Sequence, residues 1–347
     1  MVVLAPHHPE ASRFDRAQPF PIYRWPAVLG QMPGLKRAAQ FLFTLLYGWR
    51  LCRQYPIRRL ECGQALPFGM VGRLLRQRLG IPYRVWAYGD DIIKPARSLR
   101  RLLLSCLKDA DQIVAISRFS ARLLGSLGLA ESQVQVIYPL VDLRRFRAKD
   151  DAATLAHSLG LPAGPKMLTV ARLERRKGVD VVLRLLPALV EAHPNLHYVV
   201  VGDGPDRSGL ISLVEQLGLM EHVFFAGNVS MEQLPAYYAA CDLFVLLSTP
   251  HLHRGEAEGL GIVYLEAAAS GRPCVAWRTG GVEEAVVAGR TGLLVDYGDL
   301  DGARAAIDSL LSAPPYAAHL GQRGRAFAEE MVAESARRLR RLDGYDK

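Results

Sequence analysis

The chain has few cysteines and no long hydrophobic run. Its five cysteines are scattered, odd in number and never spaced as C-x-x-C: Cys52, Cys62, Cys106, Cys241 and Cys274. This pattern argues against a disulfide framework or a structural zinc site, and it favours a reducing, cytoplasmic compartment. The longest apolar-rich stretch, Phe41–Trp49, is too short to span a bilayer. The N-terminal segment breaks at Pro6 after a few apolar residues, so no signal peptide is expected.

Acidic residues are scarce in the first part of the chain. Residues 1–150 hold 24 of the 43 Lys and Arg but 10 of the 34 Asp and Glu, a net charge of +14 that leaves −5 for the rest. A basic domain beside an acidic one suggests an anionic partner. No recognised nucleic-acid motif accompanies the charge, so an anionic membrane surface is favoured over nucleic acid.

Two segments of this basic part have the pattern of amphipathic helices with basic ends. In the first, Leu35–Arg53, the apolar residues are Phe41, Leu42, Leu45 and Leu46 and the basic ones Lys36, Arg37, Arg50 and Arg53. In the second, Leu99, Leu102, Leu103, Cys106 and Leu107 form one stripe, with Arg97, Arg100, Arg101 and Lys108 around it. Such helices can lie on lipid headgroups, but packing of the apolar stripe on a sheet is favoured for each.

Short apolar strands alternate with amphipathic helices through the whole chain, which predicts an α/β fold with parallel sheets. The expected strands are Val2–Ala5, Arg59–Cys62, Tyr83–Ala87, Gln112–Ala115, Gln135–Tyr138, Met167–Val170, His197–Val201, Val223–Phe225, Leu243–Leu247, Pro273–Ala276 and Gly292–Val295. Expected helices include Val179–Ala192, Met231–Ala240 and Gly261–Ser270. The segment Arg147–Ala163 is interpreted as the linker region, which gives domains over 1–150 and 151–333 and a C-terminal helix within 334–347.

Two carboxylates eight residues apart form the most informative motif. Glu258 is followed directly by Gly259-Leu260-Gly261, and Glu266 comes eight residues after Glu258. Because eight residues are a little over two helical turns, Glu266 is predicted to lie on a helix that begins at the glycines. The unpaired N–H groups and positive dipole at such a helix start bind phosphate. A phosphate ligand and an ordinary capped helix both fit this spacing.

The motif resembles the E-x7-E signature of the retaining glycosyltransferases of family 4. These enzymes have the GT-B fold, with two Rossmann-like domains that face each other across a cleft. The resemblance implies that Glu258 contacts the donor sugar and Glu266 the nucleotide ribose, with the pyrophosphate on the turn between them at Gly259, Leu260 and Gly261. By the same resemblance, the C-terminal helix packs back against the first domain.

A basic motif upstream resembles the second donor motif of this family. In it an Arg and a Lys five residues apart hold the diphosphate, and they correspond to Arg172 and Lys177. Two fixed cations stabilise the charge that gathers on a departing nucleoside diphosphate, whereas the alternative is a solvated basic loop. The family also implies a reaction without metal or cofactor, in which the acceptor hydroxyl attacks on the leaving-group face and the departing phosphate takes its proton. The base of the nucleotide is expected near Asn228 and Val229.

Further landmarks of the family run through the chain. They are Asp109-Ala110-Asp111, Ile116–Ser120, Val141-Asp142, Arg145-Phe146, Gly280–Val286 and Thr291–Val295. The segment beginning at Glu258 and the opening FDRAQPFPIYRWP are most similar to mannosyltransferases that build phosphatidylinositol mannosides from GDP-mannose. The resemblance therefore implies transfer of a hexose, with mannose favoured, to a lipid-linked or glycan acceptor.

Two departures from the family pattern concern the first domain. The chain begins at the second strand of the family, so one strand–helix unit and its Gly-Gly turn are expected to be missing. A His-Gly of the family is replaced by Tyr88-Gly89, followed by Asp90 and Asp91, which makes Tyr88, Gly89 and Asp91 candidate acceptor-side residues. The missing unit leaves a non-catalytic nucleotide-sugar-binding protein as the alternative, with a GT-B epimerase ranked below both.

Two other motifs are set aside. Gly202-Asp203-Gly204 follows a strand like a dinucleotide fingerprint, but the next glycine, Gly209, is too far along for a dehydrogenase. His251, His253, Glu256 and Glu258 have the residue types of a metal cluster, but a polar loop explains them as well.

Overall fold

The computed structural model describes residues 1–7, 11–26, 33–89, 92, 99–147, 152–250 and 257–344. These form two compact units, one of Met1–Ala115 with Ser120–Val136 and the other of Ile116–Phe119 with Ile137–Lys347. The linker composition predicted a domain boundary at residue 150. In the structure the chain passes into the second unit earlier, between Val136 and Ile137. The last expected segment, 334–347, is not a separate element, because Glu334–Leu342 continues a helix that begins at Pro314.

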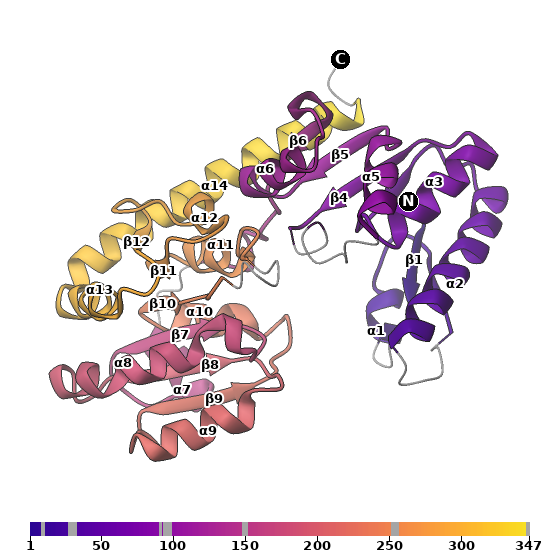
Figure 1. Ribbon diagram of the computed structural model, residues 1–347. Coiled ribbons are helices and arrows are strands. Elements are labelled where there is room, and N and C mark those ends of the chain that lie inside the picture. Colours follow the sequence, from indigo (N-terminus) through magenta and orange to yellow (C-terminus); the bar gives the residue numbers. More distant parts are fainter. Residues whose placement is uncertain are drawn as a thin grey trace. The chain divides into compact units, whose positions relative to one another are not determined.

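The first unit contains two parallel sheets (Figure 1). One pairs β1 (Val3–Pro6) with β2 (Ile22–Trp25), and the other has the order β3 (Leu60–Cys62), β4 (Tyr83–Ala87), β5 (Gln112–Ala115) and β6 (Val134–Val136). Among the described residues no strand joins β1 to β3. The helices of this unit are α1 (Ala11–Arg16), α2 (Pro33–Gln54), α3 (Phe68–Leu79), α5 (Arg100–Lys108) and α6 (Arg118–Ser126), with the 3-10 turn η2 (Glu131–Gln133).

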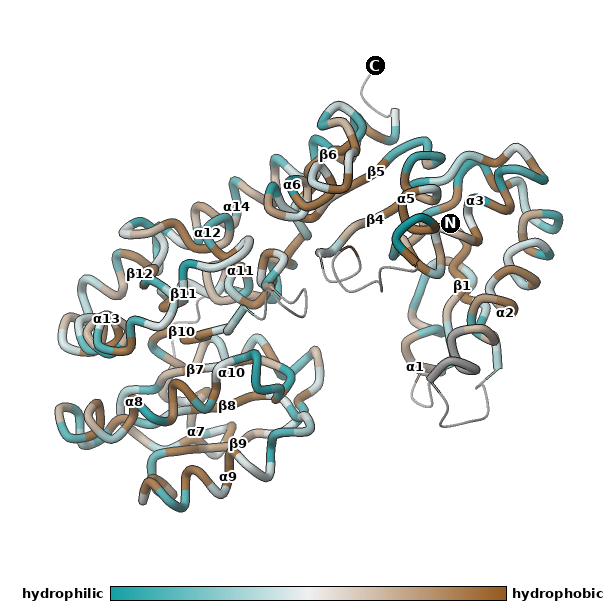
Figure 2. Tube along the Cα trace, in the orientation of Figure 1, coloured by the Kyte–Doolittle hydropathy of each residue, from teal (hydrophilic) through white to brown (hydrophobic). Residues whose placement is uncertain are grey.

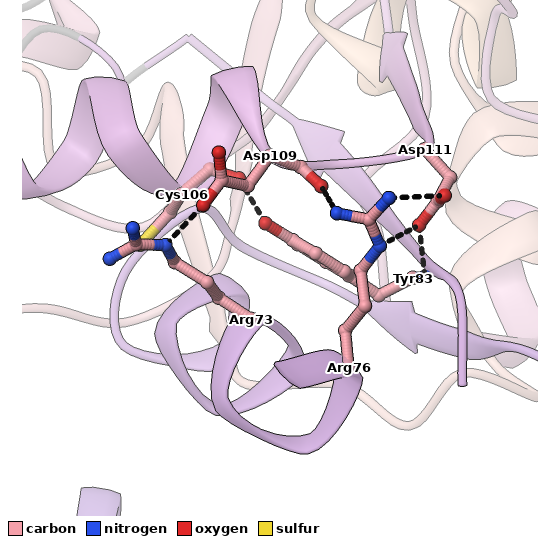
Figure 3. Close-up of polar contacts among 6 residues, drawn as sticks. All are labelled: Arg73, Arg76, Tyr83, Cys106, Asp109 and Asp111. Carbon is pink, nitrogen blue, oxygen red and sulfur yellow. Dashed lines mark hydrogen bonds and ion pairs between the residues drawn. The ribbon is translucent and has the colours of Figure 1, made fainter. Parts of the chain in front are cut away.

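Helix α3 lies close against β3 and β4 because Gly72 has no side chain. A Cβ there would come within 2.8 Å of both the Cys62 sulfur and the Tyr83 ring. The landmark carboxylates Asp109 and Asp111 hold the same helix from its polar side (Figure 3), with Arg73 Nε 2.5 Å from Asp109 and Arg76 Nε 3.1 Å from Asp111. This family landmark is therefore structural here.

The apolar stripe of α5 belongs to the core. Leu103, Cys106 and Leu107 are almost fully buried. Of the rest of the stripe, Leu102 is half-buried and Leu99 is 41% exposed. The helix therefore packs in the core through most of its stripe, as expected.

The second unit is built on one six-stranded parallel sheet. Its order is β12 (Gly292–Val295), β11 (Cys274–Trp277), β10 (Leu243–Leu246), β7 (Lys166–Val170), β8 (His197–Val201) and β9 (Val223–Gly227). Side chains alternate between the two faces of the sheet, so Val199 and Val201 enter one core cluster while Tyr198 and Val200 enter the other. The first cluster is covered mainly by α7 (Ala152–Ser158), α10 (Leu234–Ala240), α11 (Ile262–Ala269) and α12 (Val282–Ala285), and the second by α8 (Val179–Ala192), α9 (Arg207–Gln216) and α13 (Leu300–Ser312).

The long helix α14 (Pro314–Asp343) is the last element of this unit, and Figure 1 shows it in yellow beside α11 and α12. It approaches the end of α11 closely, since a Cβ on Gly321 would lie 2.1 Å from the Gly271 carbonyl oxygen. Arg325 then donates to three carbonyl oxygens, those of Phe146 at 2.5 Å, Ala269 at 2.6 Å and Leu143 at 3.1 Å. Among the helices of the described ranges, none combines the length and the apolar character that crossing a bilayer requires.

Candidate functional site

The candidate donor residues gather where the chain reverses its direction across the sheet. From β7 the chain moves outward through β8 to β9, and it then returns to β10 on the other side of β7. In a parallel sheet this switch point opens a crevice at the carboxyl ends of the strands. Arg172 and Lys177 follow β7, and Glu258 follows β10, so both expected motifs leave neighbouring strands at this place.

Lys177 and Glu258, the two predicted contacts of diphosphate and hexose, form an ion pair. Lys177 Nζ lies 2.7 Å from Glu258 Oε2, and their side chains are only 13% and 14% exposed. The Ser248 hydroxyl donates to the same oxygen at 3.2 Å. Lys177 ends a 3-10 turn, η3 (Arg175–Lys177), that is followed by Gly178 with φ +65°, where a Cβ would lie 2.0 Å from the Leu247 carbonyl oxygen. The glycine therefore lets the loop after β7 lie against the end of β10.

Arg172 is the more accessible of the two predicted cations. Its side chain is 71% exposed, and its Nε lies 2.9 Å from Glu174 Oε1. An ion pair this exposed contributes little to stability. The guanidinium is therefore available to an incoming anion, whereas Lys177 is already held in place by Glu258.

The turn Gly259–Gly261 begins helix α11, as predicted. Gly261 has φ +82°, and a Cβ there would lie 2.4 Å from the Tyr264 ring, so this position requires glycine. The first backbone N–H groups of α11 have no partner within the helix and lie at its positive end. This is the local arrangement that binds a phosphate group.

Two other segments fix the position of this turn. The Ser117 hydroxyl donates to the Gly259 carbonyl oxygen at 2.6 Å, and the Gly281 N–H donates to that of Glu258 at 2.8 Å. A Cβ on Gly281 would lie 2.1 Å from the Gly259 carbonyl oxygen. The backbone at the landmark Gly280-Gly281 therefore packs directly against the turn Gly259–Gly261 and supports it.

Glu266 lies on α11 and is one of the few buried charged residues among those described in the second unit. It is 8% exposed, and its Oε2 accepts a hydrogen bond from the Tyr238 hydroxyl at 2.8 Å. Burial raises the pKa of the Glu266 carboxyl above its usual value, while the Tyr238 hydrogen bond and the charge of Arg145 oppose that rise. A carboxylate kept at this depth by one hydroxyl retains acceptor capacity for the hydroxyls of a ligand.

A pocket of about 800 Å³ opens beside these residues. Its lining includes the predicted Arg172, Asn228 and Val229, together with Val263 in the first turn of α11. The turn Gly202–Pro205 forms another wall: Gly202 has φ +126°, and a Cβ there would lie 1.9 Å from the Ala171 carbonyl oxygen. Lys177, Glu258 and Glu266 are not among its lining residues. The pocket thus brings together the expected base residues and Arg172, whereas Lys177, the turn Gly259–Gly261 and the two carboxylates do not line it.

The candidate acceptor-side residues lie in the first unit. Tyr88 follows β4 and is 44% exposed, and Gly89 has φ +109°. Asp91 lies outside the described residues, as do His251, His253 and Glu256 of the rejected metal cluster. Within the described part of the chain, no three His, Cys, Asp or Glu side chains are arranged to hold a metal ion.

The structure adds residues that the sequence pattern did not identify. Tyr238 contacts Glu266 and Ser248 contacts Glu258. Ser117, which the sequence analysis gave only as part of the landmark Ile116–Ser120, contacts Gly259. Buried Tyr and Ser residues are common, so no local signal separated Tyr238 and Ser248 from ordinary core residues.

Glu284, which lies in the landmark Gly280–Val286, connects segments that are distant in sequence through its hydrogen bonds. Its carboxylate accepts hydrogen bonds from the backbone N–H groups of Arg118 and Phe119, both at 2.7 Å, and from the Tyr138 hydroxyl at 2.9 Å. Burial, followed by the charge of Glu284, raises the pKa of Tyr138 to about 12. Glu284 therefore joins the start of α12 to both sequence segments that enter the second unit.

Family models and named relatives both indicate a glycosyltransferase. The family described as Glycosyl transferases group 1 matches residues 156–327, and Glycosyltransferase Family 4 matches residues 1–145. Two relatives are each named GDP-mannose-dependent alpha-(1-6)-phosphatidylinositol monomannoside mannosyltransferase. That of Mycolicibacterium smegmatis is 34% identical over 80% of this chain and 74% of its own length. That of Mycobacterium tuberculosis H37Rv is 32% identical over 94% and 84%.

Solved structures agree on the fold. Anabaena HepE, in complex with UDP and glucose, has a TM-score of 0.82 at 20% identity and covers 99% of this chain and 91% of its own. Sucrose-phosphate synthase of Thermosynechococcus elongatus has a TM-score of 0.80 at 20% identity, with both chains fully covered. The named relatives are enzymes, which leaves the non-catalytic alternative without support. The chain therefore belongs to the family 4 and group 1 glycosyltransferases, and it is a glycosyltransferase of the GT-B fold.

Proposed function

We propose that this enzyme transfers a hexose, with mannose from GDP-mannose as the first candidate, to a lipid-linked acceptor with retention of the anomeric configuration. The observation that carries the proposal is the Lys177–Glu258 ion pair beside the phosphate-binding start of α11. This pair supports a donor site in which a fixed cation meets the diphosphate of a nucleotide sugar and a carboxylate meets its hexose. The names of the two mycobacterial relatives support mannose and a phosphatidylinositol-based acceptor.

The site residues have separate roles in this proposal. Arg172, Lys177 and the N–H groups around Gly261 hold the diphosphate, and Glu258 orients the hexose. Glu266 accepts hydrogen bonds from the ribose hydroxyls. The pocket wall at Asn228 and Val229 receives the base.

Chemistry in this site depends on charge stabilisation and positioning. As the bond from the anomeric carbon to the phosphate oxygen breaks, both electrons go to the departing diphosphate, whose charge Arg172, Lys177 and the α11 dipole stabilise. The acceptor oxygen bonds to the anomeric carbon on the same face, and the departing phosphate takes the hydroxyl proton. We propose that no metal ion or cofactor is needed.

The acceptor is proposed to lie at the cytoplasmic face of a membrane. The net charge of +14 over residues 1–150 supports a meeting with anionic lipid. Tyr88 and Gly89 are proposed acceptor-side residues, and Asp91 joins them by sequence alone. Tyr88 is proposed to position the acceptor and not to exchange its proton, since a phenol ordinarily titrates near pH 10.

A calorimetric titration of the full chain with GDP, UDP, ADP, GDP-mannose and UDP-glucose tests the donor. We expect GDP and GDP-mannose to bind at least about tenfold more tightly than the uridine and adenine ligands, a difference of about 1.4 kcal/mol. The same titration with Lys177→Ala should show strongly reduced affinity for every ligand with a diphosphate. Equal affinity for all bases would contradict GDP-mannose as the donor. Absence of binding to every ligand would contradict the proposed donor site.

The pH dependence of donor binding tests Glu266 separately. Because burial raises the pKa of Glu266, its carboxylate takes up a proton at a less acidic pH than an ordinary glutamate. The protonated form is a poorer acceptor, so we expect affinity for GDP-mannose to fall with decreasing pH before ordinary carboxyls titrate. GDP-mannose is the suitable ligand because its terminal phosphate is esterified and lacks the second ionisation near pH 6 of a phosphate monoester.

Glu266→Gln should remove this pH step and weaken binding at neutral pH by about tenfold to a hundredfold, the range for a hydrogen bond to a charged group. Glu215→Gln is the matched control, because Glu215 is an exposed residue of α9 in the same unit. A pH profile for Glu266→Gln identical to that of the unchanged enzyme would remove Glu266 from the donor site.

A further inference from the structure

Tyr238 connects the predicted ribose carboxylate to an aromatic cluster. Its hydroxyl donates to Glu266 Oε2 at 2.8 Å, and the Val263 carbonyl oxygen is a second acceptor at 3.3 Å. The Tyr238 ring is fully buried and contacts Phe146 and Phe244, with ring centroids 5.6 Å and 5.8 Å apart. Phe244 lies on β10, one of the hydrophobic strands drawn in brown in Figure 2. A ring packed in this way has little freedom to turn its hydroxyl away from α11.

The position of Phe146 is fixed through its backbone. Its N–H donates to the Asp142 carbonyl oxygen at 2.9 Å, and its own carbonyl oxygen accepts from Arg325 at 2.5 Å. Arg325 also donates to the carbonyl oxygens of Leu143, at 3.1 Å, and of Ala269, the last residue of α11, at 2.6 Å. One guanidinium therefore ties the segment that carries the Phe146 ring to α11.

The side chain of Glu266 has few polar neighbours. Among the described residues it accepts one hydrogen bond, from Tyr238 to Oε2, so both lone pairs of Oε1 stay available to a ligand. Burial raises the pKa of Glu266, and the Tyr238 hydrogen bond opposes this rise more than the charge of Arg145 does. Arg145 is exposed and donates to the Met231 carbonyl oxygen just before α10. Within the described ranges, Tyr238 and Arg145 are the titratable groups that act on this carboxyl.

We propose that Tyr238 is a positioning residue for the donor, which turns the Glu266 carboxylate so that Oε1 faces the ribose hydroxyls. A hydroxyl that donates to Oε1 then meets an oxygen already oriented for it. Phe146 and Arg325 act on the donor through Tyr238, which gives the Arg145-Phe146 landmark a role in binding. The inference deepens the proposed function and rests on the assignment of Glu266 to the ribose.

Tyr238→Phe removes the hydroxyl and keeps the ring. Calorimetry of the full chain with GDP and with 2′,3′-dideoxy-GDP measures the contribution of the ribose hydroxyls to binding. The unchanged enzyme should prefer GDP by about tenfold or more, as expected for hydrogen bonds to a charged group. In Tyr238→Phe this preference should fall to about threefold or less. Affinity for the dideoxy nucleotide should stay close to that of the unchanged enzyme, because the base and diphosphate contacts remain.

The pH dependence of GDP-mannose binding supplies a readout that a loss of packing alone would not move. Because the Tyr238 hydroxyl donates to the ionised carboxylate, its removal raises the pKa of Glu266 further. As the pH decreases, the affinity of Tyr238→Phe should therefore begin to fall at a higher pH than that of the unchanged enzyme. Carbon NMR of the Glu266 carboxyl in the free chain should show the same upward shift of its pKa without any ligand.

Two variants serve as matched controls. Tyr237→Phe changes the neighbouring residue of α10, which is 7% exposed and takes no part in the Glu266 hydrogen bond. Tyr198→Phe removes a buried hydroxyl that shares a hydrogen bond with the Thr169 hydroxyl at 2.7 Å, in the other core cluster. Both should keep the GDP preference and the pH profile of the unchanged enzyme. Tyr198→Phe should nevertheless unfold at a lower denaturant concentration, which separates lost stability from lost positioning.

Double variants test whether the effects pass along one path. Tyr238→Phe should not weaken donor binding further when Glu266→Gln is already present, because the hydroxyl acts through the carboxylate. Phe146→Leu should lower the GDP preference by about threefold, as for loss of an aromatic pair. It should have no further effect on this preference in the Tyr238→Phe variant.

The outcomes distinguish this inference from the proposed function on which it rests. A Tyr238→Phe variant with unchanged GDP preference and pH profile would overturn the role of Tyr238 and leave the donor site as proposed. An added loss of affinity in Tyr238→Phe with Glu266→Gln would show that the hydroxyl acts by another route, which also contradicts it. Equal binding of GDP and 2′,3′-dideoxy-GDP by the unchanged enzyme would remove Glu266 from the ribose, and this inference with it.

Discussion

Lys177→Ala is expected to lower kcat/KM for hexose transfer by about a thousandfold, the upper range for removal of one preorganised group that stabilises transition-state charge. Lys177 is held 2.7 Å from Glu258 before any ligand binds, so it needs no rearrangement to meet a diphosphate. The variant also leaves the mostly buried Glu258 carboxylate without its cation. Steady-state kinetics with GDP-mannose and thermal unfolding should therefore both change.

Two companion variants separate chemistry from stability. Lys177→Ala with Glu258→Gln removes the unpaired charge, so it should recover much of the lost stability, at most about 3 kcal/mol, without recovering activity. Arg175→Ala changes an exposed basic residue of the same 3-10 turn and should retain nearly full activity. Activity of Lys177→Ala within a few-fold of the unchanged enzyme would show that this lysine does not hold the diphosphate.

Gly281→Ala is expected to abolish donor binding through a purely steric effect. The φ of Gly281 is −92°, which alanine adopts readily, but its Cβ would lie 2.1 Å from the Gly259 carbonyl oxygen. The turn Gly259–Gly261 must then move away from the backbone that supports it. Loss of about 1–3 kcal/mol in unfolding free energy should accompany the loss of binding, as for other overpacked sites.

Gly209→Ala provides the matched control for this substitution. A Cβ on Gly209, within helix α9, would meet no atom within 4 Å. Alanine in a helix interior is favoured over glycine by up to about 1 kcal/mol, so this variant should be as stable as the parent or more so. Calorimetry with GDP-mannose and denaturant unfolding measure both effects, and donor binding by Gly281→Ala at parental affinity would contradict the supporting role of Gly281.

Periodicity and composition predict most of the elements because the parallel sheet is buried on both faces. The strand His197–Val201 and the helix Val179–Ala192 have the bounds that the apolar pattern indicates. β2 (Ile22–Trp25) was missed, since four residues between Pro21 and Pro26 alternate too briefly to give a period. The helix expected from Met231 begins at Leu234, where Pro235 occupies its first turn. Short elements depend on their neighbours more than on their own sequence.

The site could be predicted as a set of residues but not as an arrangement. The spacing of Glu258 and Glu266 correctly placed the second carboxylate on a helix that starts at the glycines. The pairing of Lys177 with Glu258 joins residues from two loops, and only the strand order of the sheet brings these loops together. The burial of Glu266 by Tyr238 likewise depends on packing between α10 and α11.

The anchoring of Glu284 has a consequence for dividing this chain into pieces. The second unit is discontinuous in sequence, because Ile116–Phe119 belongs to it although residues on both sides belong to the first. A polypeptide that starts at Ile137 would lack the N–H donors of Arg118 and Phe119 and the Ser117 hydroxyl that secures Gly259. A cut before Ile137 thus removes part of the second unit, and a cut before Ile116 keeps residues 120–136 of the first unit attached to it. A split or permuted enzyme that keeps the second unit whole must carry the short 116–119 segment with it.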